Sequence, residues 1–372
     1  MADSANKIED QIYQFNTDYS LRLKNLNLFS AYTLEESFLD YSGGTNIYRE
    51  LSEELESQFQ RLKSSISTAI SINNNRISYP FDFKYFQLSL CHGSIRDRLP
   101  AAISGTDGAT TRSIWHENSY LFSATFVGGN EKIQFTSYFN VSISFRIPSL
   151  YQQVTAWSYP LNTNPGGNLL TEYKSHREWG TSLFNGSTKS KHFPQIQFSW
   201  VLFHSLYKNK FRMLHLGGTP LVLFDNYQDA QIFGAESDLS VIFHRICSFN
   251  MAFVKYIIPD KAAFPFKPDS KVSCGATFKL INLDVDVVGY KESSRYGWIV
   301  SQISSDREMI LQELVWPEYC NMDIHLKQVF NIWRLKWFIS ASGRNIFNKS
   351  QVLEGIAIRD RRFYLTVGLE FK

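Results

Sequence analysis

The sequence predicts an all-β chain, folded as an antiparallel transmembrane β-barrel of about 14–18 strands, given the usual 9–11 residues in a membrane-crossing strand. Three observations predict this class. Apolar and polar residues alternate with a period of two along most of the chain. Aromatic residues make up 15% of the 372 residues, whereas charged residues make up only 20%. No stretch of about 18 apolar residues occurs, so the sequence predicts no transmembrane helix.

The alternation begins close to the N-terminus, in the stretch 13–24. One face of this stretch carries Tyr13, Phe15, Thr17, Tyr19, Leu21 and Leu23, and the other carries Gln14, Asn16, Asp18, Ser20, Arg22 and Lys24. A strand of a soluble sandwich would show a similar alternation, with its apolar face toward a core. In a membrane barrel the apolar face meets lipid and the polar face lines the lumen. The fully polar second face favours the barrel.

The C-terminal stretch 363–371 repeats the pattern, and so do 272–280 and 281–287. The alternation changes phase at Leu280–Ile281, which predicts a tight turn between antiparallel neighbours, with a β-bulge as the alternative. Further strands are predicted at 26–39, 57–72, 81–92, 114–127, 131–146, 172–184, 194–208, 236–247, 248–258, 319–331 and 333–343.

The predicted connections alternate between short and long ones, as in outer-membrane barrels. Lys24-Asn25 is a short connection, and the polar ranges 40–56, 93–112, 150–170 and 289–310 are long ones. The segment Arg49–Lys63 leaves two interpretations open, because its apolar residues fall at helical spacing. It is either a short amphipathic helix or a polar loop that enters a strand.

The composition argues against several function classes. A formal net charge of +3 predicts no nucleic-acid partner. The four cysteines form no CxxC and assign no disulfide. No HExxH, GxSxG, P-loop or GxGxxG motif occurs, and the histidines are dispersed, so we expect no enzymatic activity, no metal site and no cofactor.

Phe145-Arg146-Ile147-Pro148-Ser149-Leu150 resembles the FRxPS motif of the TonB-dependent outer-membrane receptors. In that family a loop follows, then Gly-Asn, Leu-x-x-Glu and a second Glu before a Gly. Matching positions here are Gly167, Asn168, Leu169, Glu172, Glu178 and Gly180, with Thr171 where the family usually has Pro.

Later segments match the same family in the same order. They contain Asn226, Gly234 and Glu236, then Phe264-Pro265-Phe266-Lys267-Pro268, then Asn345 and Phe347, and finally Phe363 in the last strand. The match is clear over 130–372 and weak over 1–129. The resemblance implies that the whole chain, 1–372, is the C-terminal portion of a receptor barrel.

The matched residues suggest mostly structural roles. Arg146 at a strand end would pair with a carboxylate such as Glu172 or Glu178. Pro148 would end its strand, and Gly234 would relieve crowding inside one. Asn345 suits a turn or bulge that leaves a strand. Trp157, in a long loop, is the one candidate for direct ligand contact.

The resemblance also implies partners and a location. The barrel would lie in outer-membrane lipid of a bacterium, with Phe371 near the end as the assembly signal that the barrel-assembly machinery reads. We find neither a signal peptide nor the N-terminal plug through which the family contacts TonB, so we expect the sequence to be truncated.

Three functions are therefore weighed. The first is a receptor barrel for uptake of a scarce ligand, such as an iron-siderophore, haem, cobalamin or an oligosaccharide. The second is a passive outer-membrane pore or a non-functional remnant, which the missing plug favours. The third is a soluble all-β binding or carbohydrate-active module, which the missing signal peptide favours.

Overall fold

The computed structural model describes residues 7–23, 26–42, 58–73, 81–98, 112–129, 133–149, 152, 169–185, 194–216, 222–243, 246–303, 309–332, 335–353, 356–358 and 360–371. The strands are β1 (Lys7–Leu23), β2 (Leu26–Ser42), β3 (Gln58–Asn73), β4 (Phe81–Arg98), β5 (Arg112–Gly129), β6 (Ile133–Arg146), β7 (Glu172–Asn185), β8 (Gln195–Leu216), β9 (Val222–Phe243), β10 (Cys247–Ile257), β11 (Ser270–Leu280), β12 (Leu283–Glu292), β13 (Arg295–Ile303), β14 (Met309–Trp316), β15 (Tyr319–Ile332), β16 (Leu335–Arg344), β17 (Gln351–Leu353), β18 (Ile356–Ile358) and β19 (Arg362–Phe371). A single-turn 3-10 helix, η1, spans Lys261–Ala263. No helix in the described part of the chain is long and apolar enough to cross a membrane.

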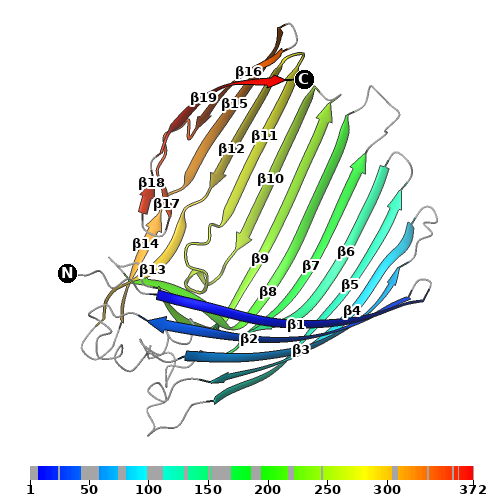
Figure 1. The fold of residues 1–372 in the computed structure, drawn as a ribbon, viewed down its shortest axis with the longest axis vertical. Helices are drawn as coiled ribbons and strands as arrows, with labels where there is room; N and C mark the ends of the chain where they lie inside the picture. The colour runs from blue at the N-terminus through cyan, green and yellow to red at the C-terminus, as the bar shows by residue number, and fades with distance from the viewer. Residues whose placement is uncertain are drawn as a thin grey trace.

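Seventeen of these strands belong to one sheet. Strands β1 to β12 pair antiparallel in sequence order, as Figure 1 shows. The order then continues from β12 to β15, β16 and β19, because the β13–β14 hairpin stands outside it. Strand β13 instead makes a short parallel pairing with the end of β8.

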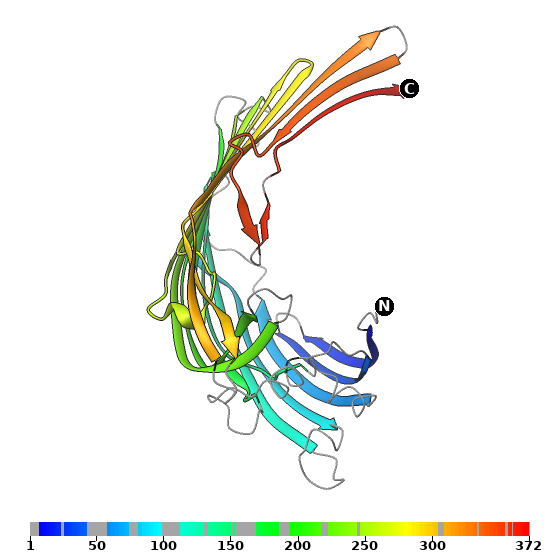
Figure 2. The same cartoon turned by 90° about the vertical axis from the view of Figure 1, so that its left-hand side faces the viewer.

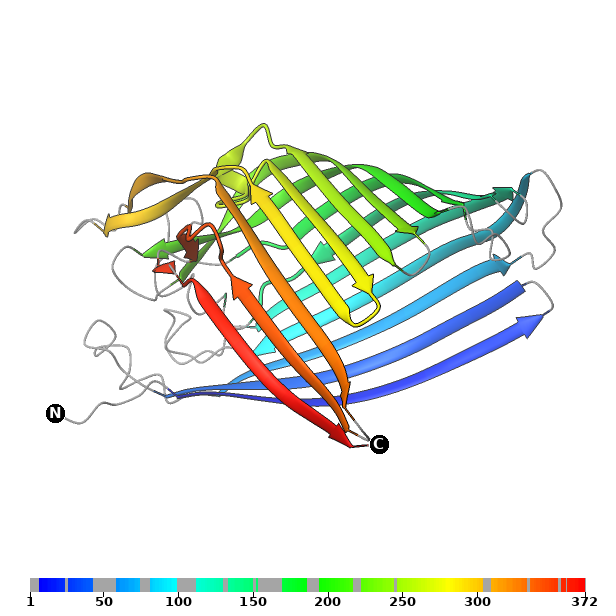
Figure 3. The ribbon, with the colours of Figure 1, turned by 90° about the horizontal axis from the view of Figure 1, so that it is seen from above.

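The sheet is curved into an open arc. Figure 2 shows the arc in profile, with β1 at one edge and β19 at the other. Figure 3 shows the same curvature from above. Strand pairing in this order is that of an antiparallel transmembrane β-barrel wall, so the predicted fold class is confirmed.

The two ends of the sheet differ in the length of their connections. At one end, paired strands are joined by two-residue connections, at 24–25, 281–282 and 333–334. At the other end, the connections are longer and include 43–57 and 99–111. We call these the short-connection end and the long-connection end.

Most predicted strands are present, and the phase change at Leu280–Ile281 is a tight turn, with Leu280 paired to Leu283. Several boundaries were wrong. Strand β1 begins at Lys7 rather than 13, β8 continues to Leu216 rather than 208, and β9 begins at Val222 rather than 236. Strand β4 continues to Arg98, into the predicted connection 93–112, and the range predicted as the connection 289–310 contains β13. These strands extend because their pairing continues beyond the strongly alternating part of each sequence.

The helical interpretation of Arg49–Lys63 is wrong where the structure describes that segment. Strand β3 begins at Gln58 and pairs with both β2 and β4, so ladder hydrogen bonds override the helical spacing of the apolar residues. The remainder, 49–57, lies outside the described residues.

Register places apolar side chains on one face of the sheet, because directly opposed residues point to the same side. One row crosses six strands and consists of Leu21, Leu28, Ile70, Leu88, Phe122 and Val141. A second row consists of Phe135, Leu183, Phe198, Leu239 and Met251. Several of these side chains are exposed, Leu88 by 49%. An apolar band of this extent needs an apolar environment.

The opposite face is polar across the same strands. One row of opposed residues consists of Arg22, Asn27, Ser71, Gln87, Ser123, Asn140 and Glu178. Ser123 donates to Asn140 at 2.6 Å, and Asn140 donates to Glu178 at 3.3 Å. The polar face therefore satisfies part of its hydrogen bonding across strands.

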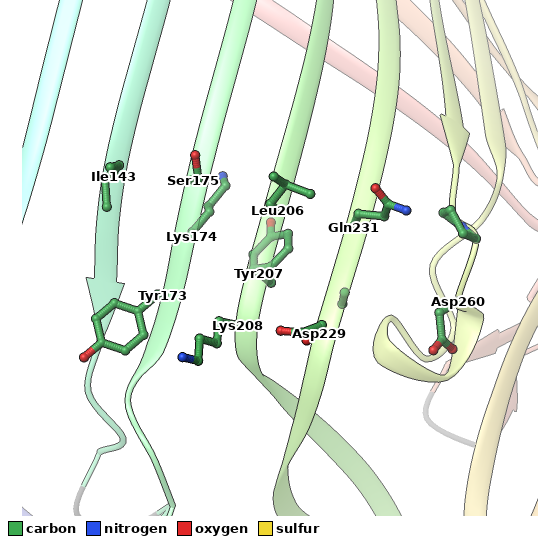
Figure 4. Close-up of a pocket in the computed structure, with 12 residues that line it drawn as sticks. Ile143, Tyr173, Lys174, Ser175, Leu206, Tyr207, Lys208, Asp229, Gln231 and Asp260 are labelled. Atoms are coloured by element: carbon green, nitrogen blue, oxygen red, sulfur yellow. The ribbon is translucent and has the colours of Figure 1, made fainter.

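The apolar band lies on the convex side of the arc. Figure 4 shows four residues of one outward row, Ile143, Ser175, Leu206 and Gln231, pointing to the viewer from β6 to β9. In that view β6 to β9 run from left to right, the reverse of their order in Figure 1. Figure 2 places the hollow of the arc on the side seen in Figure 1, so the polar face is concave.

Candidate functional site

Charged and polar side chains gather on the concave face near the long-connection end. Strand β7 contributes Lys174, His176 and Glu178, which share one face because they are two residues apart. Strand β9 contributes Glu236 to the same cavity, and the connection after η1 contributes Lys267. The cavity has a volume of about 470 Å³.

Hydrogen bonds hold the carboxylate of Glu178 in place. Asn140 Nδ2 donates to Glu178 Oε1 at 3.3 Å, and His176 Nε2 lies 3.2 Å from Glu178 Oε2. The other ring nitrogen, His176 Nδ1, lies 2.8 Å from the hydroxyl of Ser205. Three neighbouring strands thus fix the orientation of these two side chains.

Glu172 anchors the start of β7 to β8. Its Oε2 atom accepts a hydrogen bond from the backbone N–H of Phe211 at 2.6 Å and pairs with Lys210 Nζ at 2.8 Å. Lys210 also donates to the carbonyl of Phe211 at 3.0 Å. The charge of Lys210 is therefore largely compensated by this one buried carboxylate.

The side chain of Asn226 links β9 to the backbone of β8 and to the residues that precede β7. Its Oδ1 atom accepts from the N–H of Leu170 at 2.7 Å. Its Nδ2 atom donates to the carbonyls of Leu170 at 3.0 Å and Asn209 at 2.9 Å. Asn209 has a positive φ of 54°, which marks an irregularity in β8 at this point. The amide of Asn226 fixes that irregularity against the residues that precede β7.

A buried ion pair lies just beyond this junction. Arg212 Nε donates to Asp225 Oδ1 at 2.9 Å, and a second guanidinium nitrogen lies 2.5 Å from Oδ2. Asp225 is fully buried. Leu214, Leu223 and Val300 form a small apolar cluster two residues nearer the β8–β9 connection, where β13 meets β8. The ends of β8 and β9 are therefore packed as an ordered hairpin at the long-connection end.

Lysine and aromatic side chains also line the cavity. Lys174 Nζ and Lys210 Nζ lie 5.8 and 5.2 Å from the centroid of the Tyr207 ring. Lys267 Nζ lies 4.1 Å from that of Tyr256. Burial lowers the pKa of Lys267, and the positive charges of Lys271, Lys174 and Lys210 lower it further, against the opposing effect of Glu236. No group of three or more metal-ligating side chains occurs among the described residues.

Several matched residues lie close to this cavity. Glu178 and Glu236 line it, and Glu172 borders it through its ion pair with Lys210. Asn226 lies ten residues before Glu236 along β9, at the long-connection end. The ion pair suggested for Arg146 is absent among the described contacts. Its guanidinium carbon instead lies 5.4 Å from the centroid of the Phe211 ring, because Lys210 occupies the Glu172 carboxylate.

Two matched glycines face aromatic rings. A Cβ atom on Gly180 would overlap the ring of Tyr138, and one on Gly234 would overlap the ring of Phe203. Both rings lie on the directly opposed residue of the neighbouring strand, on the concave face. The same arrangement recurs with Phe338 over Gly368.

Other matched residues lie away from the cavity. Phe145 is the penultimate residue of β6, and the fully buried Pro148 follows that strand, with its carbonyl accepting from Arg61 at 2.5 Å. The hydroxyl of Ser149 accepts from the N–H of Gln152 at 3.2 Å. Asn345, with a φ of 52°, directly follows β16, and Phe347 lies in the same segment.

The last strand holds the remaining matched positions. Phe363 is 70% exposed on the convex side of β19, and Phe371 pairs through its backbone with Leu335. Asn168 and Trp157 lie outside the described residues, so ligand contact by Trp157 stays a prediction.

A second hollow lies behind the concave cavity, on the convex face (Figure 4). Ile143, Leu206, Lys208 and Asp229 are among the residues that line it. Ile143 and Leu206 belong to the apolar band, whereas Ser175 and Gln231 of the same row are polar. Lys208 and Asp229 stand directly opposite each other toward the long-connection end. This hollow marks the border between the apolar band and the polar rim.

Sequence reasoning missed the lysines of the cavity, Lys174, Lys210 and Lys267. The alternation of Lys174, His176 and Glu178 on one strand was a usable signal for the first of them. Lys267 lies in a connection and Lys210 follows the irregularity at Asn209, so no periodic pattern indicated that they share a cavity.

Comparison with solved structures defines the fold family. The copper transporter OprC superposes with a TM-score of 0.66 at 10% identity, over 97% of this chain and 57% of its own. The ferric-catecholate import receptor Fiu from K12 E. coli gives 0.61 at 11%, over 97% and 55%. The FrpB iron transporter from Neisseria meningitidis (F5-1 variant) gives 0.63 at 11%, over 97% and 56%.

These structures are TonB-dependent receptors, so the chain has the fold of their barrel. The chain spans a little over half of their length. No family model and no curated protein matches the sequence. The resemblance drawn from the sequence motifs is thus confirmed at the level of fold.

Proposed function

We propose that this chain forms the wall of an outer-membrane receptor barrel that takes up a scarce ligand. The observation that carries the proposal is the two-faced arc, apolar on its convex side and polar on its concave side across the paired strands. Such a wall separates lipid from an aqueous lumen. The similar structures include a copper transporter and a ferric-catecholate import receptor, which support uptake of a metal or a metal chelate.

The proposed partners follow from this location. Outer-membrane lipid would cover the convex band, and the barrel-assembly machinery would insert the chain. Energy for uptake would come from the TonB complex, acting through a plug. Ligand contact by Trp157 belongs to the same proposal, and Glu172, Asn226 and Gly234 would hold the wall in shape.

The alternative of a water-soluble all-β module has less support. Side chains such as Phe122, Leu202 and Trp179 are exposed on the same face, 45% in the case of Leu202. A soluble protein would leave this band in contact with water, at a large cost in free energy.

Refolding tests the proposal directly. The purified chain would be refolded with and without detergent micelles, and followed by circular dichroism and by electrophoresis of unboiled samples. We expect a strong β signal only in micelles, with a band that shifts on boiling. A monomeric, β-rich product in water without detergent would contradict the proposal. Steady conductance across a planar bilayer by this chain alone would favour the passive pore.

A further inference from the structure

Two histidine rings lie side by side on the convex face of the sheet. The ring centroids of His92 in β4 and His116 in β5 are 6.3 Å apart, and the ring planes are within 7° of parallel. The two residues are diagonal neighbours in the antiparallel pairing, because His92 stands directly opposite Asn118, and His116 stands opposite Ser94. Residues two positions apart on one strand share a face, so both rings project from the same side of the wall.

The histidine pair lies just beyond the apolar band, toward the long-connection end. Leu90 and Tyr120 are directly opposed, and they are the last pair of apolar residues in the band on these two strands. The next two pairs on the same face are polar, and each contains one of the histidines. Both histidines are exposed. Water and dissolved ions can therefore reach the two rings.

A hydrogen bond presents one ring nitrogen of His92 for coordination. His92 Nδ1 lies 2.8 Å from Asn118 Oδ1, an amide oxygen that can only accept. The ring proton therefore sits on Nδ1, which leaves the lone pair of Nε2 free to bind a metal ion. Histidines that bind metals are commonly oriented in this way by a hydrogen bond from their other ring nitrogen.

The separation of the rings suits a metal ion between them. A bond from an imidazole nitrogen to Zn²⁺ is about 2.0–2.1 Å long, and the ring centre lies ~1.1 Å behind the nitrogen. A metal ion bonded to both rings therefore holds their centres at most about 6.4 Å apart. The 6.3 Å between His92 and His116 is within this limit, so small rotations of the two exposed side chains bring both nitrogens to one ion.

We propose that His92 and His116 form a surface binding site for a divalent transition-metal ion such as Cu²⁺ or Zn²⁺. Imidazole is a preferred ligand of both ions, and Cu²⁺ binds a given set of nitrogen ligands more tightly than Zn²⁺ does. Two imidazoles leave the other coordination positions to water or to a chelating solute. The site requires only the pairing of β4 with β5, so it does not depend on the proposed uptake function.

Calorimetric titration of the refolded chain with Cu²⁺–iminodiacetate tests the proposal. This chelate leaves open positions on the ion that two neighbouring imidazoles can fill together. We expect His92→Gln and His116→Gln each to bind it at least about tenfold more weakly than the parent chain, because the second imidazole binds intramolecularly. Electron spin-echo spectra of the bound chelate should show two coordinated imidazoles in the parent chain and one in each variant.

His325→Gln is the matched control. His325 lies on the concave face in β15, with its Nδ1 atom 2.7 Å from the hydroxyl of Ser342, and no histidine of the described strands is paired beside it. This variant should leave the affinity and the spectrum unchanged. An equal loss in the control, full affinity in both single variants, or no binding by the parent chain would overturn the proposal. So would a parent spectrum with only one imidazole, a result that needs no variant to fold.

Discussion

Phe203 of β8 covers Gly234 of β9, the residue directly opposite it on the concave face. The ring occupies the space in which any other residue at 234 would place its Cβ atom. Tyr138 covers Gly180 in the same way two strands away. The wall therefore uses aromatic rings to protect glycines, a device that fixes strand register.

Gly234→Val should destabilise the fold by about 1–3 kcal/mol, because overpacking displaces the Phe203 ring or the backbone of β8. The midpoint of urea unfolding in micelles, followed by circular dichroism, measures this. Gly275→Ala is the control, since the nearest atom to its Cβ would lie at 3.9 Å. A Gly234→Val variant as stable as this control would show that the ring moves freely.

Asn226→Ala should cost about 1–3 kcal/mol, because it removes the partner of the Leu170 N–H group and of two backbone carbonyls. The same unfolding midpoint measures the change. The control is Asn250→Ala, on an exposed residue of β10 whose side chain makes no described hydrogen bond. Equal effects of the two substitutions would refute the role of Asn226 as the link between these segments.

Arg212→Met should destabilise the chain by about 3–5 kcal/mol, because it leaves the Asp225 carboxylate buried without a partner. Lys291→Met, at an exposed pair with Glu318 of 3.0 Å, should cost less than about 1 kcal/mol. Thermal unfolding in micelles compares the two. If Arg212→Met cost no more than Lys291→Met, the hairpin of β8 and β9 would be open to water.

Leu183→Arg should lower stability in lipid vesicles by about 2 kcal/mol, because Leu183 belongs to the convex apolar band. Ser182→Arg, one residue away on the concave face, should be nearly neutral. Unfolding by denaturant in vesicles measures both free energies. A reversed order of the two effects would mean that the faces are assigned the wrong way round.

Much of the fold was predictable from the sequence, because the two-residue alternation reports directly on a two-faced strand. The turn at Leu280–Ile281 was found from a phase change alone. The helical spacing of the apolar residues in Arg49–Lys63 left a helix open as an interpretation, and that interpretation was wrong for Gln58–Lys63. Local spacing carries no information about the partner strands, β2 and β4, that hold these residues in β3.

The cavity was harder to predict than the fold. Lys174 and Lys267 are 93 positions apart in the sequence, and only the pairing of β7 to β10 brings them to one cavity. The predicted ion pair of Arg146 with Glu172 or Glu178 was wrong for a related reason. Lys210 competes for Glu172 because of the irregularity at Asn209, which no sequence pattern indicated.

The central claim is that one face of the arc meets lipid while the other meets water, and spin-label scanning of Ser119 to Phe126 in β5 tests it most directly. Each position would be changed in turn to cysteine in a variant whose four native cysteines are alanine, and labelled in lipid vesicles. We predict that collision with oxygen in the lipid peaks at the even positions, such as Tyr120 and Phe122. Collision with a water-soluble nickel chelate should peak at the odd ones, Leu121 included, although leucine is apolar. Equal access of the chelate to all eight positions would contradict the account.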